Sequence, residues 1–201
     1  MFHCLIIFAL TLFCLKSSFA KIDTLTFKQV LKNENIQKSI LKEPYVSTTM
    51  SNIIYEGKKG QSMIFWAAGL HEKSCRVALR KLSRYEEYKN YLSFLEESSY
   101  FEESNRVSFI IKTSLFPIRL GLRFKIPRID KEGVFPFVFE EGFLKNLRGE
   151  IHISEDNARC FFYIKSNWQG PDSGFSNTLL ELFSNTIIKM GAEKLFRISN
   201  Y

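Results

Sequence analysis

Ile118-Arg-Leu-Gly-Leu-Arg-Phe-Lys-Ile126 is the stretch that decides the fold. Apolar residues alternate there with glycine and basic residues, which is the period of a β-strand that buries one face. The preceding stretch has the same period, with Val107, Phe109 and Ile111 on one face. Turn residues separate further apolar segments, so we expect an antiparallel meander whose later strands cover 134–140, 149–154 and 158–168.

The segment before the meander predicts one more strand and two short helices. Residues 63–70 read as an apolar strand, and Ser74 can cap the helix that follows it. Apolar residues then recur at helical spacing over 77–92, which indicates two helices that break near Ser83. A strand at 94–101 leads into the meander.

The segment after the meander predicts a long final helix over about 175–197, which follows a turn at 170–174. Its apolar stripe consists of Leu179, Phe183, Ile187, Met190 and Leu195, with Leu182 and Ile198 at the edge. The fold class is therefore α+β, and one antiparallel sheet with helices on one face is the simplest packing.

Residues 21–62 are expected to form an N-terminal extension with a short helix. Thr26 can cap that helix and Pro44 ends it. The polar residues 47–52 and the glycines of 56–60 predict a loop and a turn. We therefore expect three parts in the chain: a leader (1–20), this extension (21–62) and the main domain (63–201).

The first twenty residues have the form of a cleavable signal peptide. They are apolar almost throughout, and Ser18-Phe-Ala20 supplies the small residues that a signal peptidase accepts. The run is short for a membrane span, which needs roughly 20 apolar residues. An uncleaved N-terminal anchor is the alternative, because no Lys or Arg precedes the apolar run. We expect export to the periplasm or secretion into the medium.

The cysteine content and the net charge of the chain constrain its function only weakly. Cys75 and Cys160 remain after cleavage at Ala20, either as a disulfide or as two buried thiols. Cleavage also removes Lys16, one of the 28 basic residues of the chain, and leaves a net charge of about +6. Such an excess is compatible with peripheral contact with an anionic membrane surface or an acidic ligand, but general solubility is the better explanation.

Residues 82–98 carry a family resemblance: Leu82-Ser-Arg-Tyr-Glu-Glu-Tyr-Lys-Asn-Tyr-Leu-Ser-Phe-Leu-Glu-Glu-Ser98. With the order of the elements, this segment resembles the START-like, or SRPBCC, superfamily. The closest likeness is to its polyketide-cyclase/dehydrase and coenzyme-Q-binding (lipid-transport) branch. Ser83 and Ser93 stand where that branch often has Asp and Pro. The likeness covers about 63–198, and its further matches are Leu147-Arg-Gly149, Trp168, Pro171 and the final helix.

This resemblance implies the helix-grip fold, in which a curved antiparallel sheet wraps around a long C-terminal helix. It also implies a cavity between sheet and helix that binds sterols, lipids, quinones or aromatic polyketides. The residues expected to line it from the sheet are Phe109, Ile111, Leu120, Leu122, Phe124, Val138, Ile151, Ile153, Phe162 and Ile164. Those expected from the helix are Leu179, Phe183, Ile187 and Met190. The alternative is that these side chains simply fill a core.

Signals for catalysis are weak, and we expect no cofactor and no metal site. His71 and His152 are the histidines of the mature chain. His152 should face solvent, because Ile151 and Ile153 on either side of it are expected to point inward, and no motif near His71 supplies the orienting partner that a catalytic histidine needs. Arg119, Arg123 and Lys125 share one strand face, which is typical of a solvated sheet surface rather than a nucleic-acid site.

Three functions remain open. The first is a monomeric exported protein that binds a hydrophobic small molecule or lipid without chemistry. The second is an enzyme of the cyclase/dehydrase type. The third is a structural or interaction domain with a filled core.

Overall fold

The computed structural model describes residue 30 and residues 32–40, 42–113 and 116–198. The expected signal peptide and the helix cap at Thr26 lie outside these residues. None of the described helices is both long and apolar enough to cross a membrane.

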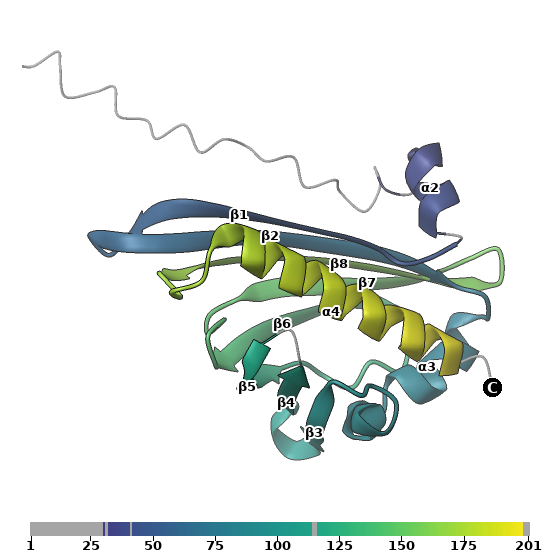
Figure 1. The fold of residues 1–201 in the computed structure, drawn as a ribbon. Helices are drawn as coiled ribbons and strands as arrows, with labels where there is room; N and C mark the ends of the chain where they lie inside the picture. Colours follow the sequence, from purple (N-terminus) through teal and green to yellow (C-terminus); the bar gives the residue numbers. More distant parts are fainter. Residues whose placement is uncertain (1–29, 31, 41, 114–115, 199–201) are drawn as a thin grey trace, which may run out of the picture.

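The core of the fold is one curved antiparallel sheet that does not close into a barrel (Figure 1). The strand order is β1-β2-β8-β7-β6-β5-β4-β3, so β1 and β3 are its edges. The meander expected from the sequence is confirmed as β4 to β8. The strands are β1 (Tyr45–Tyr55), β2 (Lys58–His71), β3 (Leu95–Phe101), β4 (Arg106–Thr113), β5 (Phe116–Lys125), β6 (Gly133–Glu141), β7 (Arg148–Asp156) and β8 (Arg159–Pro171).

The loop expected at 47–52 is wrong, because these residues belong to β1, which pairs with β2 along its whole length. Glu56 and Gly57 both have positive φ, at 49° and 75°, and connect the two strands as a tight hairpin turn. The sheet thus begins inside the segment expected to be an extension.

Helices lie on both faces of the sheet. α3 (Cys75–Leu82), the 3-10 helix η1 (Tyr85–Asn90) and α4 (Asn177–Ile198) lie on the concave side, and α4 extends along most of that face (Figure 1). α2 (Glu34–Ile40) lies on the opposite side. Together with Val30, Ile40 of α2 buries outward-facing residues of β2 and β8, namely Trp66, Ala68, Phe161 and Tyr163. The expectation that helices cover one face only was therefore incomplete.

A disulfide joins Cys75, the first residue of α3, to Cys160 of β8. Their Cα atoms are 4.4 Å apart and both side chains are buried. The Cys75 backbone N–H also donates to Glu155 Oε2 at 3.0 Å. The start of α3 is thus held against the β7–β8 hairpin.

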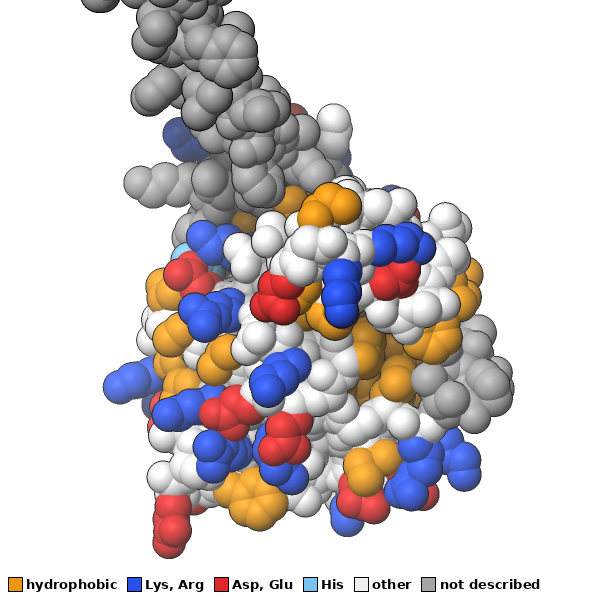
Figure 2. Space-filling view, turned by 90° about the vertical axis from the view of Figure 1, so that its left-hand side faces the viewer, with side chains coloured by type: hydrophobic (Ala, Val, Ile, Leu, Met, Phe, Trp, Pro, Cys, Tyr) orange, Lys and Arg blue, Asp and Glu red, His pale blue; other side chains and the backbone are white. Residues whose placement is uncertain are grey.

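The surface carries both signs of charge. Figure 2 shows basic and acidic side chains interspersed on one face, with hydrophobic side chains reaching the surface between them. Arg119 forms an ion pair with Glu96 at 2.8 Å, and Arg123 pairs with Glu141 at 2.7 Å. These pairs confirm that two of the basic residues of β5 belong to a solvated, charge-balanced surface.

Candidate functional site

A cavity of about 400 Å³ lies between the concave face of the sheet and α4. This volume lies within the range of roughly 300–1,000 Å³ that is usual for small-molecule sites. Apart from the hydroxyls of Ser166, Ser184 and Tyr88, the side chains that line it are apolar. Its sheet wall is rich in phenylalanine, with Phe65, Phe109, Phe124, Phe137 and Phe139.

Small residues on the inner face of α4 account for this space. Ser184, Gly191 and Ala192 face the cavity beside Phe183 and Ile187. A Cβ added at Gly191 would already lie 3.4 Å from Phe94 Cζ, so glycine lets the helix approach that ring. Several cavity-facing residues, such as Phe124 and Phe139, are only half-buried because the space beside them is not filled. The helix is therefore not packed flush against the sheet.

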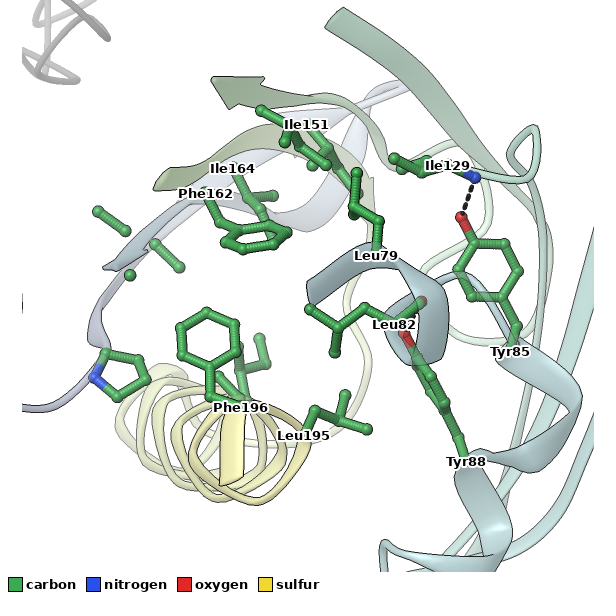
Figure 3. Close-up of a pocket in the computed structure, with 17 residues that line it drawn as sticks. Leu79, Leu82, Tyr85, Tyr88, Ile129, Ile151, Phe162, Ile164, Leu195 and Phe196 are labelled. Carbon is green, nitrogen blue, oxygen red and sulfur yellow. Dashed lines mark hydrogen bonds between the residues drawn. The ribbon is translucent and has the colours of Figure 1, made fainter. Parts of the chain in front are cut away.

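A second, smaller cavity of about 170 Å³ adjoins the first toward the C-terminal end of α4 (Figure 3). Leu79 and Leu82 of α3 line it, together with Phe162 of β8 and Phe196 of α4. The residues that the two cavities share are Tyr88, Ile151, Ile164, Ile188, Ala192 and Leu195. Apolar space therefore continues along the helix.

The tyrosine hydroxyls near the cavities are already bound within the protein. Tyr85 donates to Pro127 O at 3.0 Å and accepts from the Ile129 N–H at 3.1 Å (Figure 3). Tyr88 donates to Leu82 O at 2.5 Å. Burial raises the pKa of both phenols, so both stay neutral around neutral pH. These groups shape the wall and do not offer a free acid or base.

Solved structures share this architecture at low sequence identity. The Zhui aromatase/cyclase from a Streptomyces species matches with a TM-score of 0.57 and 9% identity, covering 69% of this chain and 94% of that chain. A START superfamily protein from Mycobacterium smegmatis matches with a TM-score of 0.53 and 6% identity, covering 68% and 97%. This chain has the START/SRPBCC helix-grip fold.

A third helix-grip match is Ara h 8.0201, with a TM-score of 0.54 and 6% identity, covering 69% of this chain and 97% of that chain. No protein-family model matches the sequence, and the search of curated proteins found no match. At these identities the likeness concerns the helix-grip fold alone.

Most residues expected to line the helix-grip cavity lie on it. Those on the larger cavity are Phe109, Ile111, Leu122, Phe124, Ile151, Ile164, Phe183 and Ile187. Phe162 and Ile153 line the smaller one. Leu120 packs beside Ile111 in the neighbouring core.

Besides Leu120, three expected residues lie outside both cavities. Val138 pairs with Lys125 on the outer face of the sheet, because Phe137 and Phe139 occupy the inward positions of β6. Leu179 and Met190 are 38% and 40% exposed on the outer side of α4. The inner stripe of the helix is displaced from them and consists of Leu180, Phe183, Ser184, Ile187, Ile188, Gly191 and Ala192.

Sequence reasoning missed much of the phenylalanine wall. Phe135, Phe137 and Phe139 alternate along β6, and this period of two was the signal that could have found them. Phe143, Leu144 and Leu147 come from the β6–β7 connection, where no periodicity marks them. Met63 and Phe65 of β2 also line the cavity.

The two histidines do not line the cavities, although the His71 ring packs edge-on against Phe196 of the smaller one at 5.6 Å between ring centroids. His71 is buried at the end of β2, where its Nδ1 accepts the Lys73 N–H at 3.0 Å, and burial lowers its pKa. His152 faces the outer side, as expected, with Nε2 3.1 Å from Glu150 Oε2. Neither is among the described residues that line the two cavities. Within the part of the chain that the structure describes, no cluster of His, Cys, Asp and Glu could hold a metal ion.

Proposed function

We propose that this protein binds a hydrophobic small molecule or lipid between the sheet and α4, without chemistry, outside the cytoplasm. The observation that carries the proposal is the cavity of about 400 Å³ with an almost wholly apolar wall. Burial of an apolar ligand there would gain roughly 25 cal/mol for each Å² of apolar surface removed from water.

The fold supports this proposal. Proteins with the START/SRPBCC fold bind hydrophobic small molecules in general. The wall around Phe124, Phe139 and the adaptable side chain of Met63 suits a ligand held by shape and apolar contact.

The few polar side chains of the larger cavity favour ligand binding over catalysis. A general acid or base must stand within hydrogen-bond reach of the reacting atoms. Among the described lining residues, the polar side-chain groups are the hydroxyls of Ser166, Ser184 and Tyr88, and Tyr88 is bonded to Leu82 O. A serine hydroxyl without a base beside it is a weak nucleophile but an adequate hydrogen-bond partner for a ligand.

Two features support the proposal of export. Ser18-Phe-Ala20 follows an apolar leader, as expected for a signal peptidase site. The disulfide between Cys75 and Cys160 is a bond that persists in oxidising compartments and is rare in the cytosol. Intact mass of the protein recovered from an expressing cell is expected to show loss of residues 1–20. Cytoplasmic protein that retains the leader would contradict export.

Binding can be tested on the full chain purified under gentle conditions. We expect native mass spectrometry to show retained ligand, and organic extraction to release a lipid or other apolar molecule. Ala192 lines both cavities, so the substitution Ala192→Phe places a ring inside them and should abolish retention and the binding of dodecanol.

Lys194→Phe is the matched control, because Lys194 is exposed on the same turn of α4. This variant should retain ligand like the wild type. Equal retention in the wild type and in Ala192→Phe would contradict binding in the cavity, as would a wild-type protein that binds neither its own lipid nor dodecanol.

A further inference from the structure

The sheet is split between β5 and β6. Their ladder joins only Arg123 to Glu141, Phe124 to Phe139 and Lys125 to Val138 within the described residues. β5 ends at Lys125, whereas β6 continues to pair with β7 back to Gly133. The N-terminal half of β6 therefore has a strand partner on one side only.

A groove of about 910 Å³ lies on the outer face at this split. Three of its lining residues, Ile126, Phe137 and Ser166, also line the inner cavity. One layer of residues thus separates the groove from the cavity. Apolar residues continue on the outer side as Ile64, Pro136 and Val138, which gives the groove a mixed character.

The charged side chains of the groove are mainly basic. They are Lys125, Arg148 and Lys165, against the single acidic residue Glu150. Glu150 already pairs with Lys165 at 3.3 Å and with His152 at 3.1 Å. Lys125 and Arg148 are exposed and have no carboxylate within 4.0 Å among the residues that the structure describes. Lys125 acts electrostatically on Glu140, which already forms an ion pair with Arg106 at 2.6 Å. Lys125 and Arg148 both line the groove beside the split.

Ser166 supplies a second, independent observation at the junction. Its side chain is buried, with 6% exposure, and its Oγ has no hydrogen-bond partner. A buried hydroxyl without a partner lowers stability unless a ligand or water satisfies it. The cross-strand neighbours of Ser166 are Phe65 and Gly149, whose side chains offer no polar atom.

We propose that the ligand is an amphiphile with an anionic head group, an inference that rests on the proposed function. The head group lies in the outer groove near Lys125 and Arg148. The apolar part enters the cavity where Ile126 and Phe137 line both spaces, and these two side chains move apart to admit it. Ser166 bonds to a polar atom of the ligand where the two parts meet. The cavity volume suits a single-chain or compact apolar part.

The probes are dodecanoate and dodecanol, which share a chain and differ in charge at mildly alkaline pH. Binding is measured by calorimetry on the full mature chain. We expect dodecanoate to bind about three- to tenfold more tightly than dodecanol at low salt, because two exposed cations face its carboxylate. That advantage should shrink as salt rises, because salt screens exposed charges, and the wild type alone can show this.

Charge reversal locates the head group. Lys125→Glu with Arg148→Glu should remove the preference for dodecanoate and leave dodecanol binding within about twofold. The control is Arg76→Glu with Arg80→Glu on α3, which changes the net charge equally on a surface separate from the groove. The control should retain the preference.

The outcomes separate the two proposals. Equal binding of dodecanoate and dodecanol, independent of salt, would overturn the head-group site and leave the apolar cavity standing. A preference that both reversed variants lose equally would also overturn it, because net charge alone would then explain the preference. If neither probe binds the wild type, the cavity function itself fails.

Discussion

Reduction of the disulfide is expected to lower the free energy of unfolding substantially. Cys75 and Cys160 are separated by 85 residues, so the bond closes a long loop in the unfolded chain. Loop-closure entropy for that length corresponds to about 4.6 kcal/mol at room temperature, and native disulfides usually contribute about 2–4 kcal/mol. A domain of this size has a total stability of only about 5–15 kcal/mol.

Urea unfolding followed by tryptophan fluorescence provides the assay. Trp66 and Trp168 are both buried and lie on opposite faces of the sheet, so their emission reports on both layers. We expect the reduced protein to unfold at lower urea concentration and with a larger m value, because the unfolded chain expands without the cross-link. Cys75→Ala with Cys160→Ala should lose stability similarly and should not respond to a reducing agent.

An unchanged unfolding midpoint after verified reduction would refute the reasoning. It would mean either that the unfolded chain stays compact around this loop or that the bond adds strain to the folded state. Alkylation of Cys75 and Cys160 in the untreated, denatured protein, assigned by peptide mass to keep them apart from Cys4 and Cys14, would refute the disulfide itself.

Three further changes have defined outcomes. Burial lowers the pKa of His71 in the folded protein, so below pH 6.5, the ordinary histidine pKa, the unfolded chain binds more protons than the folded one. The free energy of unfolding should therefore fall as the pH drops through 6.5, by up to about 1.4 kcal/mol per pH unit. His71→Gln should flatten this pH dependence, measured as urea midpoints. Ser166→Ala removes an unpaired buried hydroxyl and should stabilise the ligand-free protein by about 1 kcal/mol while weakening dodecanoate binding; lower stability would show that Ser166 has a partner. Gly149→Ala places a Cβ against Lys165 O and the Phe137 ring, so it should cost about 1–3 kcal/mol in thermal unfolding, and an unchanged melting temperature would contradict that packing.

Periodicity predicted the strands that bury one continuous apolar face. β5 and β8 were predicted correctly because apolar and polar residues alternate strictly along them, a period that fits a β-strand and not a helix. β1 was missed because Thr48 and Met50 are its inward residues, within a run of serine, threonine and asparagine. A polar edge strand carries little hydrophobic signal, and the hairpin turn at Glu56 and Gly57 was the better evidence for it.

The sequence predicted the presence of α4 correctly but not which of its faces packs against the sheet. The prediction counted large apolar residues and therefore placed Leu179 and Met190 inside. In the structure the inward stripe includes Ser184, Gly191 and Ala192, whose small size creates the cavity. A count of large apolar residues identifies the side chains that fill a core. It does not identify the small residues that leave space for a cavity.

The central claim is that apolar space separates α4 from the sheet. A crystal of the protein under xenon pressure tests it directly, because xenon enters dry apolar cavities. The account predicts xenon density between Phe183 of α4 and Phe124 or Ile151 of the sheet, and none there in Ala192→Phe. A wild-type crystal in which phenylalanine rings fill that space and exclude xenon would contradict the account.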